Sequence, residues 1–363
     1  MNKKRFDELL QMAVEDGVSD IIFAVGEPPM FRYSGALMDV RADLLQARDT
    51  ELLARLLLQS REEDFNLFMA AEVAYEIEDV GRFRASIFKQ RNSFRIVMRV
   101  IPIEVRTFAE LNLPSEITVL AELTRGLVLV TGATGQGKST TLSAIIEQIN
   151  RTRKTHIITI EDPIEFTYAK ARSLITQREI GDDVPDYQTA LRQALRQSPD
   201  VIMVGEIRDA QTFEAVLTGA ETGHLMMSAI HTTDAQKTFG RILGFYPHEE
   251  RQAVRERLAN NLVAIISLRL LPCRKDGGQV PAVEILRMNA AIADCLRNPE
   301  KMSEITTHME RGRDYYGMRV FDQHILELYH TGMIDLETAL GAATRPTEIE
   351  RTLTLEGAES QLS

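Results

Sequence analysis

Residues 132–139 read Gly132-Ala133-Thr134-Gly135-Gln136-Gly137-Lys138-Ser139 and match the pattern G-x-x-x-x-G-K-[ST]. The motif follows an apolar run, residues 127–131, and precedes a helix-forming run, which is the setting of a phosphate-binding loop. Its glycines let backbone amides approach phosphate oxygens without a clashing Cβ atom, and the positive end of the next helix dipole points at the same anion. This stretch therefore predicts an α/β nucleotide-binding domain.

The polar residues of this loop have expected roles in holding ATP and Mg²⁺. Lys138 is expected to neutralise the β- and γ-phosphates, Ser139 to hold Mg²⁺ through its hydroxyl, and Thr140 to donate to a phosphate nearer the sugar. We assign the remaining nucleotide contacts of the loop to Gly132, Thr134, Gly135 and Gly137.

A second apolar run, residues 201–204, leads into Gly205 and Glu206. Ligands of α/β sheets lie at the carboxyl ends of the strands, so an acid is expected here. Glycine replaces the acid that usually stands directly after such a strand. We therefore expect Glu206 to perform the function of that acid. The sequence leaves open whether Glu206 orders a metal-bound water or polarises the attacking water. With Ser139, it is the expected metal-site residue.

A third apolar run, residues 157–160, leads into the carboxylates Glu161, Asp162 and Glu165. One of them is expected to activate the attacking water, and such general-base help is worth on the order of 10²–10⁴ in rate. The alternative is an ordinary acidic surface loop.

Two histidines flank a fourth apolar run, residues 225–230. We expect this strand to lie between the strand of the phosphate loop and the strand of residues 201–204, which puts His231 beside the γ-phosphate as a sensor of its presence. His224 stands at the other end of the strand. For either histidine, a purely structural role is the alternative.

Four arginines are expected to form a basic face on the first domain. Arg82 and Arg84 share one face of a predicted strand, and Arg95 and Arg99 share one face of another, because side chains alternate along a strand. One interpretation is that these arginines form an ordinary solvated sheet face. The other is that the arginines of one subunit contact the nucleotide bound to its neighbour, since arginine stabilises the charge of phosphoryl transfer.

The order of apolar patterns predicts two domains. Residues 1–101 read as a small α+β domain with an antiparallel sheet. It is expected to contain a helix over residues 6–14, two further helices, of which the second starts with a capping box at Ser60 and Glu63, and strands at 21–24, 30–33, 73–78, 82–88 and 94–101. Residues 102–118 are the expected linker. Residues 119–343 read as a parallel sheet buried on both faces that becomes mostly helical after Leu271, and residues 344–363 as a polar tail.

Composition excludes several other classes of protein. The 363 residues carry 42 Lys and Arg against 53 Asp and Glu, a net charge of −11 that disfavours nucleic acid as a partner. No run approaches the roughly 18 apolar residues of a membrane span, and the early Asp7 and Glu8 do not suit a signal peptide, so we expect a cytoplasmic protein. The two cysteines, Cys273 and Cys295, exclude a disulfide framework and a tetracysteine zinc site.

Together, these motifs resemble the secretion ATPase superfamily, and within it the PilT/PilU family of type IV pilus retraction ATPases, over nearly the whole chain. Residues 159–166 are similar to that family's Asp box, residues 204–209 to its Walker B element and residues 223–233 to its His box. The resemblance implies that Glu165, the second glutamate of the Asp box, is the catalytic base. It also implies that this base is joined around the γ-phosphate by Glu206, His224 and His231.

The resemblance also separates branches of the superfamily. Assembly ATPases usually carry a tetracysteine zinc motif that this chain cannot form, which favours the retraction branch. Residues 81–92 and 318–323 look closer to PilU than to PilT, and Ala-Ile-Ala-Asp-Cys-Leu at residues 291–296 departs from the AIRNL segment of PilT. Members of the PilU branch are auxiliary motors, so a sister PilT ATPase is an expected partner.

The fold implied by the resemblance is a PAS-like first domain followed by a RecA-like P-loop ATPase domain with a helical C-terminal extension. Six subunits are expected to form a homohexameric ring at the inner-membrane base of the pilus machine, where ATP hydrolysis between the domains moves a membrane platform protein. Two other classes stay open: a RecA-like nucleic-acid motor, and a nucleotide-binding regulatory subunit with little turnover. Whether the chain acts alone, whether it mixes with a sister ATPase, and which way the ring turns are also left open.

Overall fold

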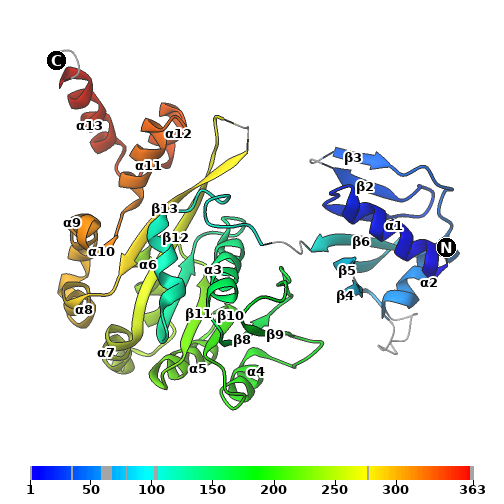
Figure 1. Ribbon diagram of the computed structural model, residues 1–363, viewed down its shortest axis with the longest axis horizontal. Helices are drawn as coiled ribbons and strands as arrows, with labels where there is room; N and C mark the ends of the chain where they lie inside the picture. Colours follow the sequence, from blue (N-terminus) through cyan, green and yellow to red (C-terminus); the bar gives the residue numbers. More distant parts are fainter. Residues whose placement is uncertain are drawn as a thin grey trace. The chain divides into compact units, whose positions relative to one another are not determined.

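The chain folds into two compact units, each with its own sheet (Figure 1). The computed structural model describes residues 2–33, 36–58, 68–78, 80–101, 105–275 and 278–359. The first unit comprises Met1–Glu104 and Glu165–Ala169, and the second comprises Val105–Ile164 and Lys170–Ser363. Among the helices within the described ranges, none combines the length and hydropathy that crossing a bilayer requires.

The described residues of the first unit form a six-stranded antiparallel sheet, in the order β3-β2-β1-β6-β5-β4, and two helices. Its elements are α1 (Lys3–Glu15), β1 (Asp20–Phe23), β2 (Met30–Tyr33), β3 (Ala36–Asp39), α2 (Ala47–Leu58), β4 (Ala70–Ile77), β5 (Gly81–Gln90) and β6 (Ser93–Ile101). Helix α1 buries Phe6, Leu10 and Ala13, which lie three or four residues apart, against the same core as the alternating Phe83 and Ile87 of β5. The predicted α+β domain is confirmed.

Two details of this unit differ from the sequence pattern or lie beyond it. Strand β3 was not predicted, because all four of its residues are exposed and show no buried face. The helix start predicted at Ser60 and Glu63 falls outside the described residues.

The second unit is built on a seven-stranded sheet in the order β13-β12-β7-β11-β10-β8-β9. Its strands are β7 (Gly126–Thr131), β8 (His156–Glu161), β9 (Leu174–Glu179), β10 (Val201–Glu206), β11 (Leu225–Ile230), β12 (Leu262–Pro272) and β13 (Gln279–Arg287). All neighbours pair in parallel except β12 and β13. Strand β11 lies between β7 and β10, which confirms the order predicted for the histidine-flanked strand.

The helices of the second unit are α3 (Lys138–Thr152), α4 (Tyr187–Ala194), α5 (Ala210–Glu221), α6 (Ala235–Leu243), α7 (Arg251–Asn261), α8 (Ala290–Arg297), α9 (Ile305–Arg311), α10 (Arg313–Tyr316), α11 (Phe321–His330), α12 (Leu336–Ala342) and α13 (Pro346–Glu359). Three 3₁₀ turns join them: η1 (Ser115–Glu122), η2 (His248–Glu250) and η3 (Pro299–Glu304). The helices from α8 onward follow one another beyond β13, in orange to red (Figure 1), and form the predicted helical C-terminal region.

The chain becomes mostly helical after Leu271, as predicted, but strand β13 comes first and was not predicted. It contains Pro281, which lacks the N–H group that a strand donates to its neighbour. However, β13 is the edge strand of the sheet, where a missing N–H group is tolerated. Seven of its nine residues are also buried, so the strand lacks the alternation that would have identified it.

The stretch expected to be a polar tail contains helix α13. Ile349 is 1% exposed and packs with Phe321 and Ile325 of α11, and Leu353 packs against the same cluster, so two apolar residues four positions apart anchor a mostly polar helix. Upstream of its first turn, the carboxylate of Asp322 accepts hydrogen bonds from the backbone N–H groups of Thr344 and Arg345, at 2.7 and 2.9 Å. The start of α13 is therefore held by a residue 22 positions earlier in the chain, and no local sequence pattern predicts such a contact.

Part of the predicted linker is packed into the second unit. Residues 102–104 lie outside the described ranges, whereas residues 105–118 belong to that unit. Phe108, Leu113 and Ile117 are buried, and η1 packs against α3. The domain boundaries drawn from sequence stay predictions.

A buried carboxyl group lies under the start of α6. Glu284 of β13 accepts a hydrogen bond from the N–H group of Ala235 at 2.8 Å and another from the hydroxyl of Ser267. Ser267 in turn accepts from Thr131, which ends the strand before the phosphate loop. Burial, which outweighs these hydrogen bonds, raises the pKa of Glu284 to about 7.

Glu284 makes stability depend on pH. Between pH 4.5, the ordinary value, and pH 7, the folded chain keeps a proton that the unfolded chain has lost, so stability falls as pH rises through this window, by about 3 kcal/mol in all. Glu284→Gln keeps an oxygen acceptor for Ala235 and removes this titration. In urea unfolding, the variant should match the wild type at pH 5 and exceed its stability at pH 8. The exposed Glu249→Gln is the control, and an equal pH dependence of wild type and Glu284→Gln would contradict this account.

Candidate active site

The phosphate loop joins β7 to α3 in conformations that suit glycine. Gly132, Gly135 and Gly137 have φ values of 153°, 79° and 86°, in the region that L side chains rarely adopt. At Gly132 a Cβ atom would also lie 2.9 Å from the carbonyl oxygen of Leu268 in β12. Because Gly137 is the N-cap of α3, no side chain blocks the helix start, and its free N–H groups are available to an anion.

A chain of polar side chains crosses the carboxyl ends of β7, β11 and β10. The Nζ atom of Lys138, which is 8% exposed, donates to the Ala133 carbonyl at 2.8 Å and lies 3.3 Å from Nδ1 of His231. Nε2 of His231 lies 2.6 Å from Oε2 of Glu206, whose other oxygen accepts from Arg208. The structure therefore brings together three of the residues predicted for the site.

The partners of His231 define its tautomer. An ammonium group only donates, so Nδ1 must accept from Lys138 and the ring proton must lie on Nε2, where it is donated to Glu206. Partial burial acts to raise the pKa of Glu206, but the hydrogen bonds from His231 and Arg208 outweigh it and hold the pKa below its usual range. Glu206 is therefore ionised at neutral pH.

The acidic loop after β8 places its three carboxylates differently. Glu161 is 6% exposed, and its Oε1 accepts from Thr159 at 2.7 Å and from Gln177 at 3.2 Å. Asp162 is exposed beside the cis-proline that follows it. Glu165 is exposed as well and belongs to the first unit, whereas the phosphate loop belongs to the second. Its role as catalytic base stays a prediction.

His224 is not brought into this cluster. It precedes β11, at the amino end of the strand, while His231, seven residues further along the chain, follows the carboxyl end. At about 3.3 Å per residue the strand separates them by roughly 23 Å. Nδ1 of His224 lies 3.1 Å from both the Gly219 carbonyl and the Thr222 hydroxyl, which fixes the turn after α5. Within one chain the two histidines therefore stand at opposite ends of β11, and a role of His224 at the γ-phosphate stays a prediction.

The four predicted arginines do share one face of the first sheet. Arg84 lies directly opposite Arg99 in the β5–β6 pairing, and Arg82 and Arg95 follow on the same side of their strands. The face also carries acids. Arg82 pairs with Glu76, Arg84 with Glu72 and Arg99 with Asp20, at 3.3, 3.5 and 3.1 Å. It is therefore a mixed, ion-paired surface, and a role of these arginines toward nucleotide stays a prediction.

A cleft of about 360 Å³ opens beside the phosphate loop. Its lining includes Gly137 and Thr140 from the loop and α3, Leu268 and Leu270 from β12, and the polar residues Arg106, Glu110 and Asn112. These last three come from the stretch expected to be a linker, so sequence reasoning missed them as site residues. The cleft is large enough for the base and sugar of a nucleotide whose phosphates lie in the loop.

A tyrosine hydroxyl that sequence reasoning also missed lies against the end of β10. A Cβ atom on Gly205 would be 3.3 Å from the hydroxyl oxygen of Tyr187, at the start of α4. Burial, together with the Asp162 and Glu206 carboxylates, raises the pKa of this phenol. Within the described residues the hydroxyl has no hydrogen-bond partner, an unusual state for a buried polar group. The position of Tyr187 in the sequence did not mark it as a site residue, because an aromatic residue at the start of a helix is usually predicted to pack in the core.

The strand order, the glycine turn and the acid after β10 together define a RecA-like nucleotide-binding protein of the P-loop class. The family model described as type II/IV secretion system protein matches residues 2–359. The chain belongs to this family.

Two curated relatives and one crystal structure align with almost the whole chain. The type IV pilus retraction ATPase PilT of Pseudomonas aeruginosa is 37% identical over 340 residues, which are 93% of this chain and 98% of that protein. The type IV pilus ATPase PilU of the same organism is 37% identical over 356 residues, 98% and 92% of the two chains. The crystal structure of the pilus retraction motor PilT with bound ADP superposes with a TM-score of 0.86 at 39% identity, covering 95% and 98%.

Replacing Tyr187 by Phe tests whether its hydroxyl lacks a hydrogen-bond partner in the nucleotide-free protein and gains one during turnover. Removing an unpaired buried hydroxyl should stabilise the nucleotide-free protein by about 1 kcal/mol and slow ATP turnover roughly fivefold, the worth of one hydrogen bond. Urea unfolding and phosphate release measure the two effects. Tyr246→Phe is the matched control, because the Tyr246 hydroxyl donates to Glu214 at 3.1 Å and its loss should destabilise the chain. Destabilisation by Tyr187→Phe would contradict the inference.

Proposed function

We propose that the chain is an ATPase of the type IV pilus machine: a subunit of a hexameric motor that hydrolyses ATP to power pilus retraction and twitching motility. The catalytic part of this proposal rests on one observation: the side chains of Lys138, His231 and Glu206 are linked in series by polar contacts at the end of the phosphate loop. The pilus part rests on family membership and on the names of the PilT and PilU relatives.

The first step is the exchange of partners by Lys138. Without nucleotide, its ammonium group is held by the Ala133 carbonyl and by His231, both of which are weaker partners than a triphosphate. When ATP enters, the ammonium group moves to the β- and γ-phosphate oxygens, and the N–H groups at the start of α3 bind the same anion. The adenosine part occupies the cleft beside Thr140 and Leu270.

The second step passes through His231. Once Lys138 has left, Nδ1 of His231 has lost its donor, and its lone pair accepts from a water molecule bound at the γ-phosphate, while Nε2 still donates to Glu206. The imidazole therefore links the presence of the γ-phosphate to the orientation of Glu206. The ionised Glu206 then orders the attacking water, and Glu165 is the base that we propose takes its proton.

Ser139 and Glu206 offer hydroxyl and carboxylate oxygens, the donors that Mg²⁺ prefers, and bound Mg²⁺ would supply charge neutralisation to the phosphates. One carboxylate oxygen of Glu206 would have to leave Arg208 or His231 to do so.

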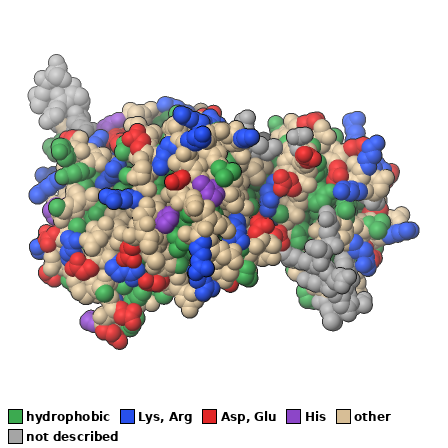
Figure 2. Space-filling model, turned by 60° about the horizontal axis from the view of Figure 1, so that its bottom comes forward, with side chains coloured by type: hydrophobic (Ala, Val, Ile, Leu, Met, Phe, Trp, Pro, Cys, Tyr) green, Lys and Arg blue, Asp and Glu red, His purple; other side chains and the backbone are tan. Residues whose placement is uncertain are grey.

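The proposed partners are five further copies of the chain, an inner-membrane pilus platform protein and a sister PilT ATPase, at the cytoplasmic side of the inner membrane. The arginines of the first sheet, Arg82, Arg84, Arg95 and Arg99, are proposed to reach the nucleotide of a neighbouring subunit. Figure 2 shows Lys and Arg side chains interspersed with Asp and Glu over the visible face, without a continuous basic field of the kind that holds a phosphate backbone.

Phosphate release by purified protein tests the catalytic proposal. Lys138→Ala should lose both binding of a fluorescent ATP analogue and turnover, whereas Glu206→Gln should keep binding and lose turnover by on the order of 10²-fold. The matched control is Glu256→Gln, which removes an acid that pairs with Arg297 on the surface and should leave both unchanged. Equally slow release by wild type and both site variants would make the chain a regulatory subunit. Stimulation by DNA that weakens with salt would make it a nucleic-acid motor.

Twitching motility tests the cellular proposal. In a deletion strain that keeps its PilT homologue, we expect motility to fail under load, when pili pull against a viscous or adhesive surface, and to be restored by the wild-type gene. The Lys138→Ala gene should not restore it. Deletion of the PilT homologue as well should abolish retraction without load. Normal motility of the single deletion strain under every load would argue against a role in retraction.

A further inference from the structure

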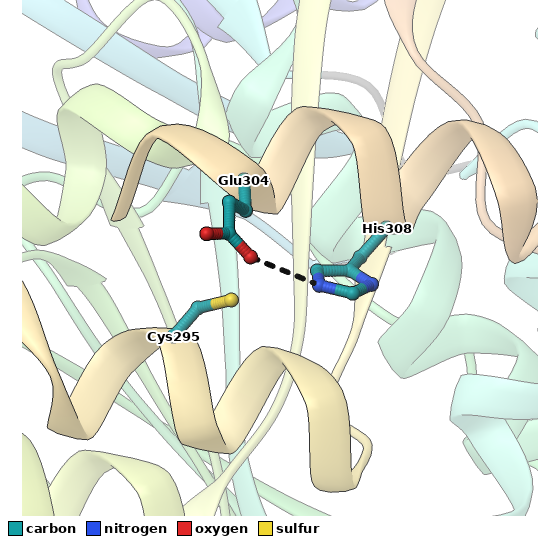
Figure 3. Close-up of side chains that lie close together, drawn as sticks. All are labelled: Cys295, Glu304 and His308. Carbon is teal, nitrogen blue, oxygen red and sulfur yellow. Dashed lines mark ion pairs between the residues drawn. The ribbon is translucent and has the colours of Figure 1, made fainter. Parts of the chain in front are cut away.

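Three side chains that commonly bind metals converge among the C-terminal helices. Cys295 lies on α8, Glu304 at the end of η3, and His308 on α9 (Figure 3). The thiol of Cys295 points toward the carboxylate and the imidazole, which stand side by side on the neighbouring helical segment. Sγ, one carboxylate oxygen and one ring nitrogen all lie within 4.8 Å of one another.

The spacing of the three atoms suits a shared ion. Zinc binds sulfur at about 2.3 Å and nitrogen or oxygen at about 2.0–2.2 Å, so the ligand atoms of a tetrahedral site lie roughly 3.3–3.7 Å apart. Nε2 of His308 and Oε2 of Glu304 are 3.9 Å apart. Small side-chain rotations close the remaining gap, and Glu304 and His308 have the freedom to make them, since their side chains are 57% and 32% exposed.

Cys295 is the fixed member of the group. It is 1% exposed and sits in the main core cluster of the second unit with Ile305 and Met309 of α9. The packing of α8 against η3 and α9 therefore holds the thiol in place, while the exposed pair gives an ion a path from solvent. A water molecule would complete a tetrahedral set of ligands.

An ordinary helical ion pair does not account for the arrangement. Glu304 and His308 are four residues apart, a spacing that favours pairing, but at 3.9 Å they form no hydrogen bond to each other. The neighbouring acid Asp294 is already bound by Lys301 at 2.6 Å. The carboxylate and the imidazole both face the thiol.

The donor set selects the kind of metal. A thiolate and an imidazole are soft or borderline ligands that favour zinc and related transition metals over Mg²⁺ or Ca²⁺. One thiolate and one carboxylate together balance the charge of a divalent ion, which lowers the cost of placing it at the edge of the core.

We propose that Cys295, Glu304 and His308 bind one Zn²⁺ ion, at a site separate from the nucleotide site and unlike the tetracysteine motif that this chain lacks. On binding, the S–H bond of Cys295 breaks, its proton passes to solvent and a sulfur–zinc bond forms, with no change of oxidation state. The ion ties α8 to α9 and so stiffens the helices that follow β13.

Cobalt titration of the full-length, nucleotide-free protein tests the site. Co²⁺ takes the place of Zn²⁺ and gives a thiolate-to-cobalt absorption band only when a cysteine is a ligand. We expect this band to saturate at one equivalent and to disappear when Zn²⁺ is added. Zinc should also raise the thermal unfolding temperature of the protein in a concentration-dependent way.

Matched variants locate the site. Cys295→Ser should abolish the band, whereas Cys273→Ser, at the other buried cysteine, should keep it. His308→Gln and Glu304→Gln should weaken binding at least tenfold, while His248→Gln and Glu300→Gln should not. If Cys295→Ser fails to fold, the exposed His308 and Glu304 variants decide the question alone. Absence of the band in the wild type, or an unchanged affinity for cobalt in the His308 and Glu304 variants, would overturn the proposal.

Discussion

The geometry of the phosphate loop is set by one close approach of two backbones. Gly132 passes so near the carbonyl oxygen of Leu268 that a single added carbon would lie 2.9 Å from it. This contact fixes the loop to β12 and leaves its N–H groups, with those at the start of α3, directed at one point. The parallel sheet then brings the ends of β7, β11 and β10 to the same edge, and with them Lys138, His231 and Glu206. A different strand order would have separated these side chains.

The sequence predicted what depends on local pattern. The glycine turn, the strand order around β11 and the approach of His231 to the loop were all anticipated, because apolar runs locate strands and parallel strands share one functional edge. The features that were not predicted from the sequence have a common cause: they depend on contacts between residues that are distant in the chain. Strand β13 is identified by its partner β12, and α13 depends on Asp322. The lining residues Arg106 and Asn112 are placed by the packing of η1 on α3.

Within the candidate site, membership in a motif was an incomplete guide to which residues come together. His224 and His231 both belong to the His box, yet they stand at opposite ends of one strand, and only His231 meets the acid of β10. Tyr187 belongs to no motif that was recognised, and its buried hydroxyl nevertheless lies against Gly205, where a Walker B acid is usually found. The arginines of β5 and β6 share the predicted face, but Glu72, Glu76 and Asp20 accompany them, and acids on neighbouring strands cannot be assigned to a face before the register is known.

The resting partners of Lys138 make nucleotide affinity the outcome of a competition. In the proposed mechanism the ammonium group leaves the Ala133 carbonyl and the imidazole of His231 to meet the phosphates, so stronger contacts to these two partners would lower the affinity for ATP. The same contacts provide hydrogen-bond acceptors for a buried positive charge. A motor that must bind, hydrolyse and release in turn benefits from such a balance, since a loop that held its lysine less firmly would release its product more slowly.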